Sequence, residues 1–236
     1  MKTATLASIR DHALRDLPNE ACGFILNADG NEKVFPVRNM HDKPAESFAV
    51  HPGDYLEAKR AGTLLALYHS HPAGPAAATR IDTLACNRSG LVWYVYSVPD
   101  ETVSKIVPAG RAPLHGRPFV WGVYDCWTLV YDYYQEKLGI TLPDWEPYEE
   151  DFWEKGKNYY VERYAQFGFV PVQDLRCHDV LLMQLGGRVK MPIHSGIYQS
   201  NGTLLHHVPG RLSTSDVYGD YLRSMTNLVL RHGSLL

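Results

Sequence analysis

Residues 63–87 read TLLALYHSHPAGPAAATRIDTLACN, and this stretch determines the fold expected for the first half of the chain. The β-prone run 63–71 predicts a strand that ends in two histidines. Proline, glycine and alanine then predict a loop, and residues 79–87 predict a helix. A strand, a loop and a helix in succession indicate a unit that mixes α and β structure.

The same mixture continues on both sides of this stretch. Apolar residues at helical spacing predict a helix over 4–16, and a second helix is expected over 54–61. Short apolar runs predict strands at 22–27, 33–37, 91–98 and 102–107. We therefore expect a mixed sheet with helices in an N-terminal domain.

A break in this pattern follows at 108–118, which reads PAGRAPLHGRP. Three prolines and two glycines in eleven residues disfavour regular structure, so we expect a linker here. The linker would separate a domain of residues 1–109 from a domain of residues 115–236. Two domains of this size agree with the length of the chain, 236 residues.

The second half begins with helices and ends with strands. The segment DCWTLVYDYYQEKLGI predicts a helix over 125–140, and another helix is expected over 149–166. A short helix is also expected over 214–224. Strands are expected at 179–185, 194–199, 203–207 and 226–231. Helices followed by an antiparallel sheet are typical of the α+β class, which we expect for both domains.

Composition excludes several classes of protein. The net charge of −3 provides no basic surface, so we expect no nucleic-acid partner. No apolar run reaches the roughly 18–20 residues of a membrane helix, so we expect no membrane span. Charged residues interrupt the N-terminal apolar positions, which predicts an amphipathic helix rather than a signal peptide and folding in a cytoplasm. Cys22, Cys86 and Cys177 are expected as small buried residues.

One group of polar residues surrounds the two histidines. His69 and His71 are two residues apart at the end of a strand, so their side chains point to the same side. Asp82 and Thr79 share one face of the helix that follows. Two imidazoles and one carboxylate leave the fourth position of a tetrahedral Zn²⁺ free for water, which is the catalytic pattern. Glu20, just before an expected strand, is the candidate general base.

A lone His-x-His pair is common in proteins, but the pattern here is longer. It resembles the motif of the JAMM (MPN, Mov34/PAD-1) metalloproteases: an upstream Glu, His-x-His, seven residues, Ser, two residues and Asp. This chain has Thr79 in place of Ser and keeps the hydroxyl with which the family supports the tetrahedral intermediate. The resemblance covers the first domain. It implies Zn²⁺ held by His69, His71 and Asp82, with Glu20 in acid–base catalysis.

A second group of reactive residues lies in the other half. Cys126 opens an expected helix with Asp125 at its N-cap, where the helix dipole lowers a thiol pKa from about 8.5. A thiolate also needs a base and a group that orients the base. His194 and His206 lie on two strands joined by an Asn-Gly hairpin turn, so they can stand side by side in these roles. His207 is the alternative for the orienting role.

These segments resemble the NlpC/P60 cysteine peptidases. The family pattern is an aromatic residue, two residues and Gly, then Asp-Cys opening a helix, then His-x-Gly-Ile-Tyr and a third polar residue twelve positions on. HSGIY at 194–198 and the step to His206 fit this pattern. The resemblance covers about 115–236 and implies a papain-like α+β fold, with Cys126 as nucleophile and His194 as base.

The chain departs from the NlpC/P60 pattern around the cysteine. The family commonly has Ser-Gly after the cysteine, whereas this chain has Trp127 and Thr128. The upstream tyrosine of the family is replaced by Phe119 or Trp121. The nucleophile and base are retained, while the surroundings of the substrate differ.

The two domains in this order resemble the tail assembly proteins of lambda-like tailed phages. The resemblance implies assembly with other tail tip proteins in the host cytoplasm, and it leaves open whether the protein stays in the finished virion. It also implies peptidoglycan stem peptides as substrate of the second domain. We expect a hydrolase with a zinc (iso)peptidase site and a cysteine endopeptidase site. One alternative is an assembly factor with vestigial sites, and another makes the second domain an acyltransferase or amidase.

Overall fold

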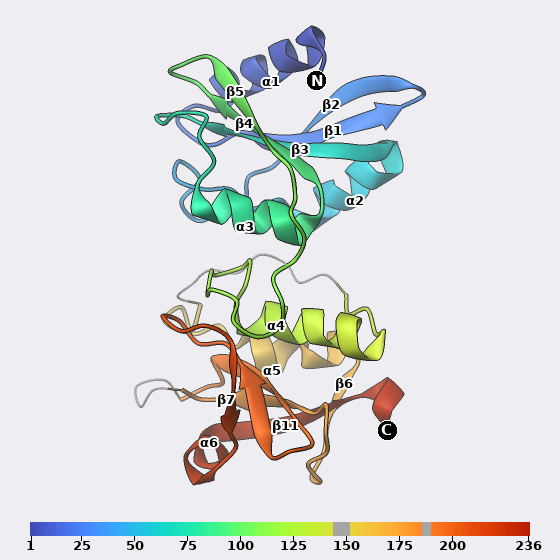
Figure 1. Cartoon of the computed structure of the whole chain (residues 1–236), viewed down its shortest axis with the longest axis vertical. Coiled ribbons are helices and arrows are strands. Elements are labelled where there is room, and N and C mark those ends of the chain that lie inside the picture. Colours follow the sequence, from blue (N-terminus) through green and yellow to red (C-terminus); the bar gives the residue numbers. More distant parts are fainter. Residues whose placement is uncertain (144–151, 186–189) are drawn as a thin grey trace. The chain divides into compact units, whose positions relative to one another are not determined.

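The computed structural model describes residues 1–143, 152–185 and 190–236. The described residues divide into two compact units, one of residues 1–112 and one that starts at Pro113 (Figure 1). Each unit contains its own β-sheet and its own helices. Between the units, residues 107–119 contain no helix or strand.

The N-terminal unit is built on a five-stranded mixed sheet in the order β2-β1-β3-β4-β5. Strands β3 and β4 are parallel, and every other neighbouring pair is antiparallel. In chain order the elements are α1 (Thr3–Asp16), β1 (Cys22–Ala28), β2 (Asn31–Val37), α2 (Pro52–Ala61), β3 (Thr63–His71), α3 (Arg80–Ser89), β4 (Val92–Ser97) and β5 (Thr102–Ile106). This confirms the predicted mixed sheet.

Helices cover both faces of this sheet (Figure 1). Successive side chains of a strand point to opposite faces. On β1, Phe24 packs in one core cluster with Ala58 of α2 and Cys86 of α3. Its neighbour Ile25 packs in the other cluster, with Ile9 of α1. Helix α1 therefore covers one face of the sheet, while α2 and α3 cover the other.

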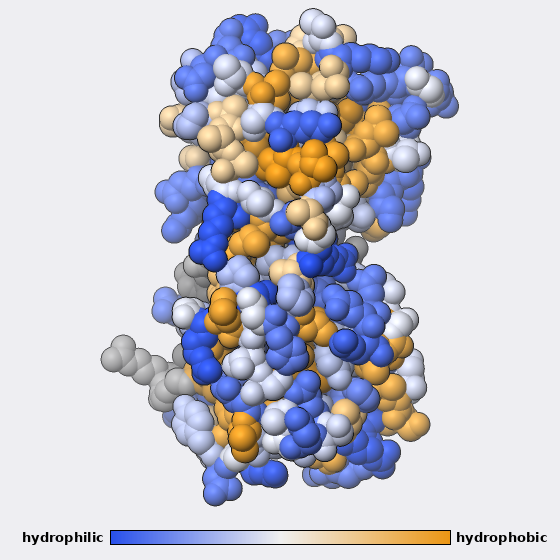
Figure 2. Space-filling view, viewed as in Figure 1, coloured by the Kyte–Doolittle hydropathy of each residue, from blue (hydrophilic) through white to orange (hydrophobic). Residues whose placement is uncertain are grey.

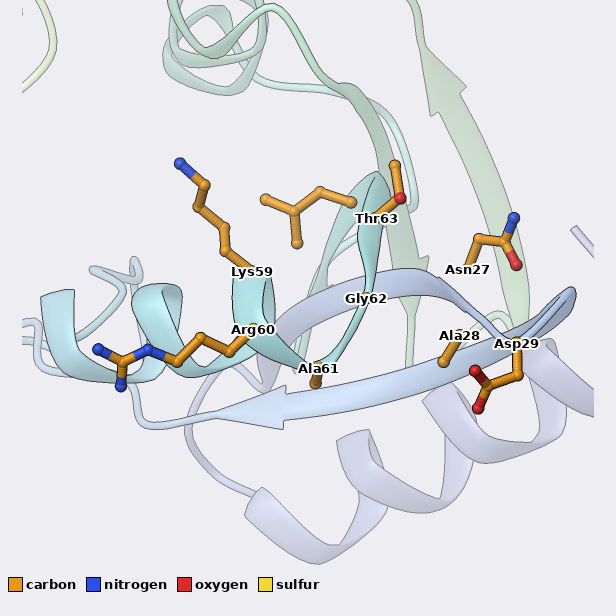
Figure 3. Close-up of a pocket in the computed structure, with 9 residues that line it drawn as sticks. Asn27, Ala28, Asp29, Lys59, Arg60, Ala61, Gly62 and Thr63 are labelled. Atoms are coloured by element: carbon orange, nitrogen blue, oxygen red, sulfur yellow. The ribbon is translucent and has the colours of Figure 1, made fainter.

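The turn from α2 into β3 requires a glycine. A Cβ atom at Gly62 would lie 2.5 Å from the carbonyl oxygen of Asn27. The close approach leaves a shallow hollow of about 600 Å³ at this edge, with Lys59 and Arg60 on one side and Asp29 on the other (Figure 3). The charged side chains do not converge on a common point, so the hollow is explained by the tight turn.

The C-terminal unit is built on a six-stranded antiparallel sheet in the order β10-β9-β8-β7-β11-β6. Its α-helices are α4 (Cys126–Tyr133), α5 (Tyr159–Arg163) and α6 (Asp220–Met225). Its strands are β6 (Phe169–Pro171), β7 (Val180–Met183), β8 (His194–Tyr198), β9 (Thr203–His206), β10 (Thr214–Val217) and β11 (Thr226–His232). Helices followed by an antiparallel sheet confirm the predicted α+β class.

The sheet of this unit is also buried on both faces. Leu181 and Met183 of β7 pack with Leu222 of α6 in one cluster. The alternate residues Val180 and Leu182 are fully buried as well and point to the opposite face. Helix α4 packs against β8, which places the first residues of the helix beside that strand.

Several boundaries differ from the sequence-based expectations. The helix predicted over 125–140 is α-helical only to Tyr133 and continues as a π-helix over Tyr134–Leu138. Of the helix predicted over 149–166, the first three residues lie outside the described residues, and the described part contains α5 and a 3₁₀ turn. The helix predicted over 214–224 is wrong at its start, because residues 214–217 form β10 and pair with β9.

The surface of the N-terminal unit shows apolar side chains gathered in the middle of the face seen in Figure 2, among polar ones. Isolated exposed apolar residues such as Leu56, Leu65 and Val107 are ordinary on protein surfaces. Within the described part of the chain, no helix combines the length and apolar character needed to cross a membrane.

Candidate functional sites

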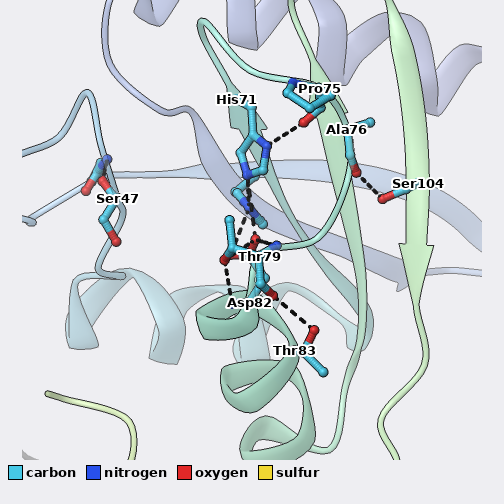
Figure 4. Close-up of polar contacts among 10 residues, drawn as sticks. Ser47, His71, Pro75, Ala76, Thr79, Asp82, Thr83 and Ser104 are labelled. Carbon is cyan, nitrogen blue, oxygen red and sulfur yellow. Dashed lines mark hydrogen bonds and ion pairs between the residues drawn. The ribbon is translucent and has the colours of Figure 1, made fainter. Parts of the chain in front are cut away.

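Strand β3 and helix α3 position the first group of polar residues. His69 and His71 end β3 and point to the same side, as their spacing predicts. Asp82 lies in the first turn of α3 and faces them (Figure 4). All three residues are largely buried, with His69 fully so. The structure therefore brings the three predicted metal ligands together.

The distances among these atoms fit a metal ion. His69 Nε2 and His71 Nε2 are 3.1 Å apart, and Asp82 Oδ1 lies 3.3 Å from His69 Nε2. Asp82 Oδ2 lies 3.6 Å from His71 Nε2. Ligand atoms bound at about 2.0–2.2 Å to a tetrahedral ion are roughly 3.3–3.6 Å apart. No other group of three such side chains in the described residues converges in this way.

Thr79 fixes the position of Asp82. It is the N-cap of α3, where its hydroxyl accepts a hydrogen bond from the Asp82 amide. The amide and hydroxyl of Thr79 both donate to Asp82 Oδ2, each at 2.7 Å. Two donors on Oδ2 leave Oδ1 available to a cation. The geometry gives the Thr79 hydroxyl a structural role as a cap, in addition to the substrate role implied by the resemblance.

Ring contacts hold His69, whereas a hydrogen bond holds His71. Phe48 stacks on the His69 ring at 4.7 Å between centroids, and Trp93 meets it edge-on at 5.7 Å. The buried Nδ1 atom of His69 has no hydrogen-bond partner among the residues that the structure describes. In contrast, Nδ1 of His71 lies 2.7 Å from the carbonyl oxygen of Pro75. Aromatic stacking therefore replaces the usual outer hydrogen bond of a metal-binding histidine at His69.

Glu20 lies directly before β1, beside the end of β3. The neighbouring Ala21 amide donates to the Ser70 hydroxyl at 2.9 Å, which fixes this segment against β3. Burial raises the pKa of Glu20 to about 7, with the Asp82 carboxylate adding to the rise and His71 opposing it. The structure thus places Glu20 near the two histidines and Asp82 as a carboxyl group able to carry a proton at neutral pH.

The second group of residues begins at the start of α4. Asp125 is the predicted N-cap, and its side chain accepts a hydrogen bond from the Thr128 amide at 2.8 Å. The Thr128 hydroxyl in turn accepts from the Asp125 amide, which completes a capping box. Cys126 is therefore the first helical residue and is held rigidly.

The thiol of Cys126 is more enclosed than the sequence predicts. The residue is 4% exposed, and its Sγ lies 3.1 Å from the hydroxyl of Tyr160 on α5. Burial and the Asp125 carboxylate raise the pKa of Cys126 to about 11, and hydrogen bonds from Tyr160 and Ser195 oppose the rise. The expected lowering of the pKa by the helix dipole is wrong here, because burial and a neighbouring negative charge outweigh it.

His194 and His206 meet across strands β8 and β9. Nε2 of His194 lies 3.1 Å from Nδ1 of His206, and both residues are 4% exposed. Burial lowers the pKa of His194, and His206 and His207 lower it further. His207 does not pair with them; it packs against Phe119 at 5.0 Å between ring centroids. Of the two candidates for the orienting role, the geometry favours His206.

Sequence reasoning missed three residues near these sites. Asp216 on β10 lies 3.1 Å from Nε2 of His206, and Tyr160 and Phe48 contact Cys126 and His69 as described above. Each contact depends on how separate elements pack, so spacing along the chain does not reveal it. Asp216 also lies in residues 214–217, for which the sequence analysis predicts a helix and the structure shows a strand.

Comparison with known proteins agrees with the two-unit architecture. The family of prokaryotic homologs of the JAB domain matches residues 2–107, and the NlpC/P60 family matches residues 116–231. The fold and sites thus define a protein in which a JAB domain precedes an NlpC/P60 domain.

The similarity to curated proteins extends over almost the whole chain. The tail tip assembly protein K of Escherichia phage N15 is 34% identical over 238 residues, covering 98% of this chain and 96% of that protein. The protein of the same name from Escherichia phage lambda is 36% identical over 183 residues, covering 77% of this chain and 88% of that protein. The chain belongs to the tail tip assembly protein K family.

A third relative matches a shorter stretch. The probable TtuB-protein conjugate cleaving protease of Thermus thermophilus is 40% identical over 76 residues. The match covers 30% of this chain and 51% of that protein.

Proposed function

We propose that this tail assembly protein is a hydrolase with two separate peptidase sites. The N-terminal site is a zinc-dependent peptidase or isopeptidase, and the C-terminal site is a cysteine endopeptidase that cuts peptidoglycan stem peptides. The protein would act with other tail tip proteins in the host cytoplasm during virion assembly. The observations that support the proposal are the convergence of His69, His71 and Asp82 in one unit and, in the other, the contact of His194 with His206 on a strand against which the helix of Cys126 packs.

In the N-terminal site, His69, His71 and Asp82 would hold Zn²⁺. When bound, zinc polarises a carbonyl group and lowers the pKa of a water molecule. Glu20 would take the proton from the attacking water and pass it to the leaving amine. Similarity to a conjugate-cleaving protease supports an isopeptide bond as a substrate class for this site.

In the C-terminal site, Cys126 would be the nucleophile and His194 the base. His194 removes the thiol proton as Sγ attacks the scissile carbonyl, and the same proton then passes to the leaving amine. Water then attacks the thioester carbonyl, and His194 takes a proton from the water and returns it to Sγ as the carboxylic acid product leaves. His206 would orient the base. The Tyr160 hydroxyl, 3.1 Å from Cys126 Sγ, would supply the phenol that is missing upstream, where this chain has Phe119 or Trp121.

The metal part of the proposal is tested by zinc content. Purified protein should bind one Zn²⁺ per chain, and His71→Ala should lose it, whereas Cys126→Ala should keep it. An isopeptide-linked conjugate incubated with the zinc-loaded protein then tests cleavage. Retention of stoichiometric zinc by His71→Ala would contradict the assigned ligand set.

A second candidate function is assembly without catalysis, in which the sites serve binding only. The enclosed thiol of Cys126 and its raised pKa favour this alternative. Digestion of purified murein separates the two. An endopeptidase releases stem-peptide fragments that mass spectrometry identifies, and Cys126→Ala should reduce release by at least about 10³-fold. A folded, zinc-loaded wild-type protein that releases nothing would favour the assembly function.

A further inference from the structure

His206 stands between two hydrogen-bond partners on different strands. Its Nδ1 faces Nε2 of His194 at 3.1 Å, and its Nε2 faces Oδ2 of Asp216 at 3.1 Å. Strands β9 and β10 pair so that Leu204 is opposite Asp216 and His206 is opposite Thr214. Asp216 is therefore a diagonal neighbour of His206 on the same face of the sheet.

We propose that Asp216 is a positioning residue that fixes the order of protons along the two histidines, so that Nδ1 of His194 is the basic nitrogen. The proposal rests on the proposed cysteine peptidase function, for which His194 is the base. Asp216 acts on His194 only through His206.

The proton order follows from the chemistry of the three groups. An ionised carboxylate only accepts hydrogen bonds, so Nε2 of His206 must carry the hydrogen. In the singly protonated form of His206, the lone pair is then on Nδ1, which accepts from His194. Nε2 of His194 must therefore donate, which leaves the lone pair of His194 on Nδ1.

At neutral pH the Asp216 carboxyl group is ionised and the His194 imidazole is uncharged. Burial acts to raise the pKa of Asp216, but hydrogen bonds from His206 and Arg211 lower it overall, so the carboxyl group is ionised at neutral pH. Arg211 Nη1 lies 3.2 Å from the same oxygen that faces His206. The pKa of His194 is lowered mainly by burial, so its imidazole is neutral at that pH.

The Cys126 thiol lies near His194, because α4, which begins at Cys126, packs against β8, which begins at His194. The Cys126 thiol interacts with the backbone and side chain of Ser195, the residue next to His194. Nε2 of His194 is already engaged by His206. Without Asp216, the hydrogen of His206 can move to Nδ1, which would push the hydrogen of His194 onto its own Nδ1 and abolish the base.

The expected size of the effect is moderate. The Asp216 side chain is 34% exposed and lies in a surface hollow with His206 and Arg211, where water can partly replace it. Residues that orient a metal-binding histidine typically contribute 10–100-fold, and we take the same range for a residue that orients a catalytic histidine. We expect Asp216→Ala to lower kcat by roughly 10–100-fold with little change in KM. Asp216→Asn should recover most of this, because an amide oxygen can accept from Nε2.

Tautomers measured by NMR test the proposal without any substrate. Two-bond ¹H–¹⁵N spectra of full-length protein labelled at histidine report which ring nitrogen carries the hydrogen, with His194→Gln and His206→Gln used for assignment. We expect the Nε2–H form at both residues in the wild type and in Arg211→Ala. In Asp216→Ala both residues should show a mixture of forms, with circular dichroism confirming the fold.

An Nδ1–H form of His194 in the wild type would overturn the proposal, as would unchanged tautomers in Asp216→Ala. Kinetics on murein peptides are measured separately. Tautomers that behave as expected in a protein that releases no murein peptide would uphold the proton order and contradict the endopeptidase function. Loss of kcat equal to that of Asp216→Ala in the matched Arg211→Ala would assign the effect to surface charge instead.

Discussion

At the scale of single residues, the charge states of Cys126 and His194 decide how the cysteine site works. Burial and Asp125 raise the pKa of the thiol to about 11, and burial lowers that of the imidazole. Both groups are therefore uncharged at neutral pH. The pair differs from a preformed thiolate–imidazolium pair, so the proton must move during the attack on substrate.

This charge state makes alkylation of Cys126 a direct test. With a raised pKa, the thiolate fraction is small at pH 7 and grows as the pH rises toward about 11. The rate of reaction with iodoacetamide should rise continuously over this range. Intact-mass measurements in a Cys177→Ser background, which removes the half-buried thiol, follow the reaction at Cys126. A fast rate that is constant across neutral pH would show a resting thiolate.

Phe48 offers a second test at this scale. Its ring stacks on His69, whose Nδ1 has no hydrogen-bond partner in the described part of the chain, so stacking is the contact that orients this imidazole. We expect Phe48→Ala to weaken zinc binding by about 10-fold, the lower end of the effects seen for residues that orient metal ligands. Competition with a zinc chelator measures the affinity, and Phe48→Tyr keeps the ring as the control. Equal affinities in both variants would contradict the role of stacking.

The convergence of His69, His71 and Asp82 was predictable because their geometry is local. Strand alternation places His69 and His71 on one side, and the capping box places Asp82 in the first turn of the next helix. The contacts of Asp216, Tyr160 and Phe48 depend on how separate strands, helices and loops pack. A single sequence contains no local signal for such contacts.

At the scale of elements, the start of α3 links helix stability to the proposed metal site. Thr79→Ala removes the side-chain cap and one donor to Asp82, so we expect a loss of about 1 kcal/mol in the free energy of unfolding and weaker zinc binding. Thr79→Ser keeps the hydroxyl and should change neither. Chemical denaturation and zinc titration measure the two effects. An unchanged zinc affinity in Thr79→Ala would show that the Thr79 cap does not support zinc binding.

The elements themselves show where sequence patterns fail. Residues 214–217 form a strand because β9 is available to pair with them, and this tertiary partner outweighs the local preference. The helix from Cys126 ends at Tyr133 and changes to a π-helix, which its apolar periodicity does not reveal. The long β-prone runs 63–71 and 91–98 were predicted nearly to the residue, since both strands are largely buried.

At the scale of the whole molecule, two units with separate cores should unfold separately. We propose that zinc binds only the N-terminal unit. A chelator should therefore lower the midpoint temperature of only one of two calorimetric transitions. In the C-terminal unit, Arg117 and Asp132 form a fully buried ion pair at 2.7 Å. Arg117→Leu leaves the Asp132 carboxylate buried without its partner. It should lower the free energy of unfolding of the C-terminal unit by about 3–5 kcal/mol, which shifts the other transition.

The matched double variant Arg117→Leu with Asp132→Leu removes both charges and should recover much of this loss. Its recovery would show that the cost in the single variant comes from the unpaired carboxylate. A chelator and Arg117→Leu that both shift the same transition would contradict two separately stabilised units.

The independence of the two sites is tested by peptide release from purified murein. Release is measured for wild type, Cys126→Ala, His69→Ala and the double variant, with zinc content determined on the same samples. We predict that release is lost with Cys126→Ala and kept in His69→Ala, while zinc is lost with His69→Ala and kept in Cys126→Ala. Release that survives Cys126→Ala, or disappears with His69→Ala in a folded protein, would contradict two independent sites.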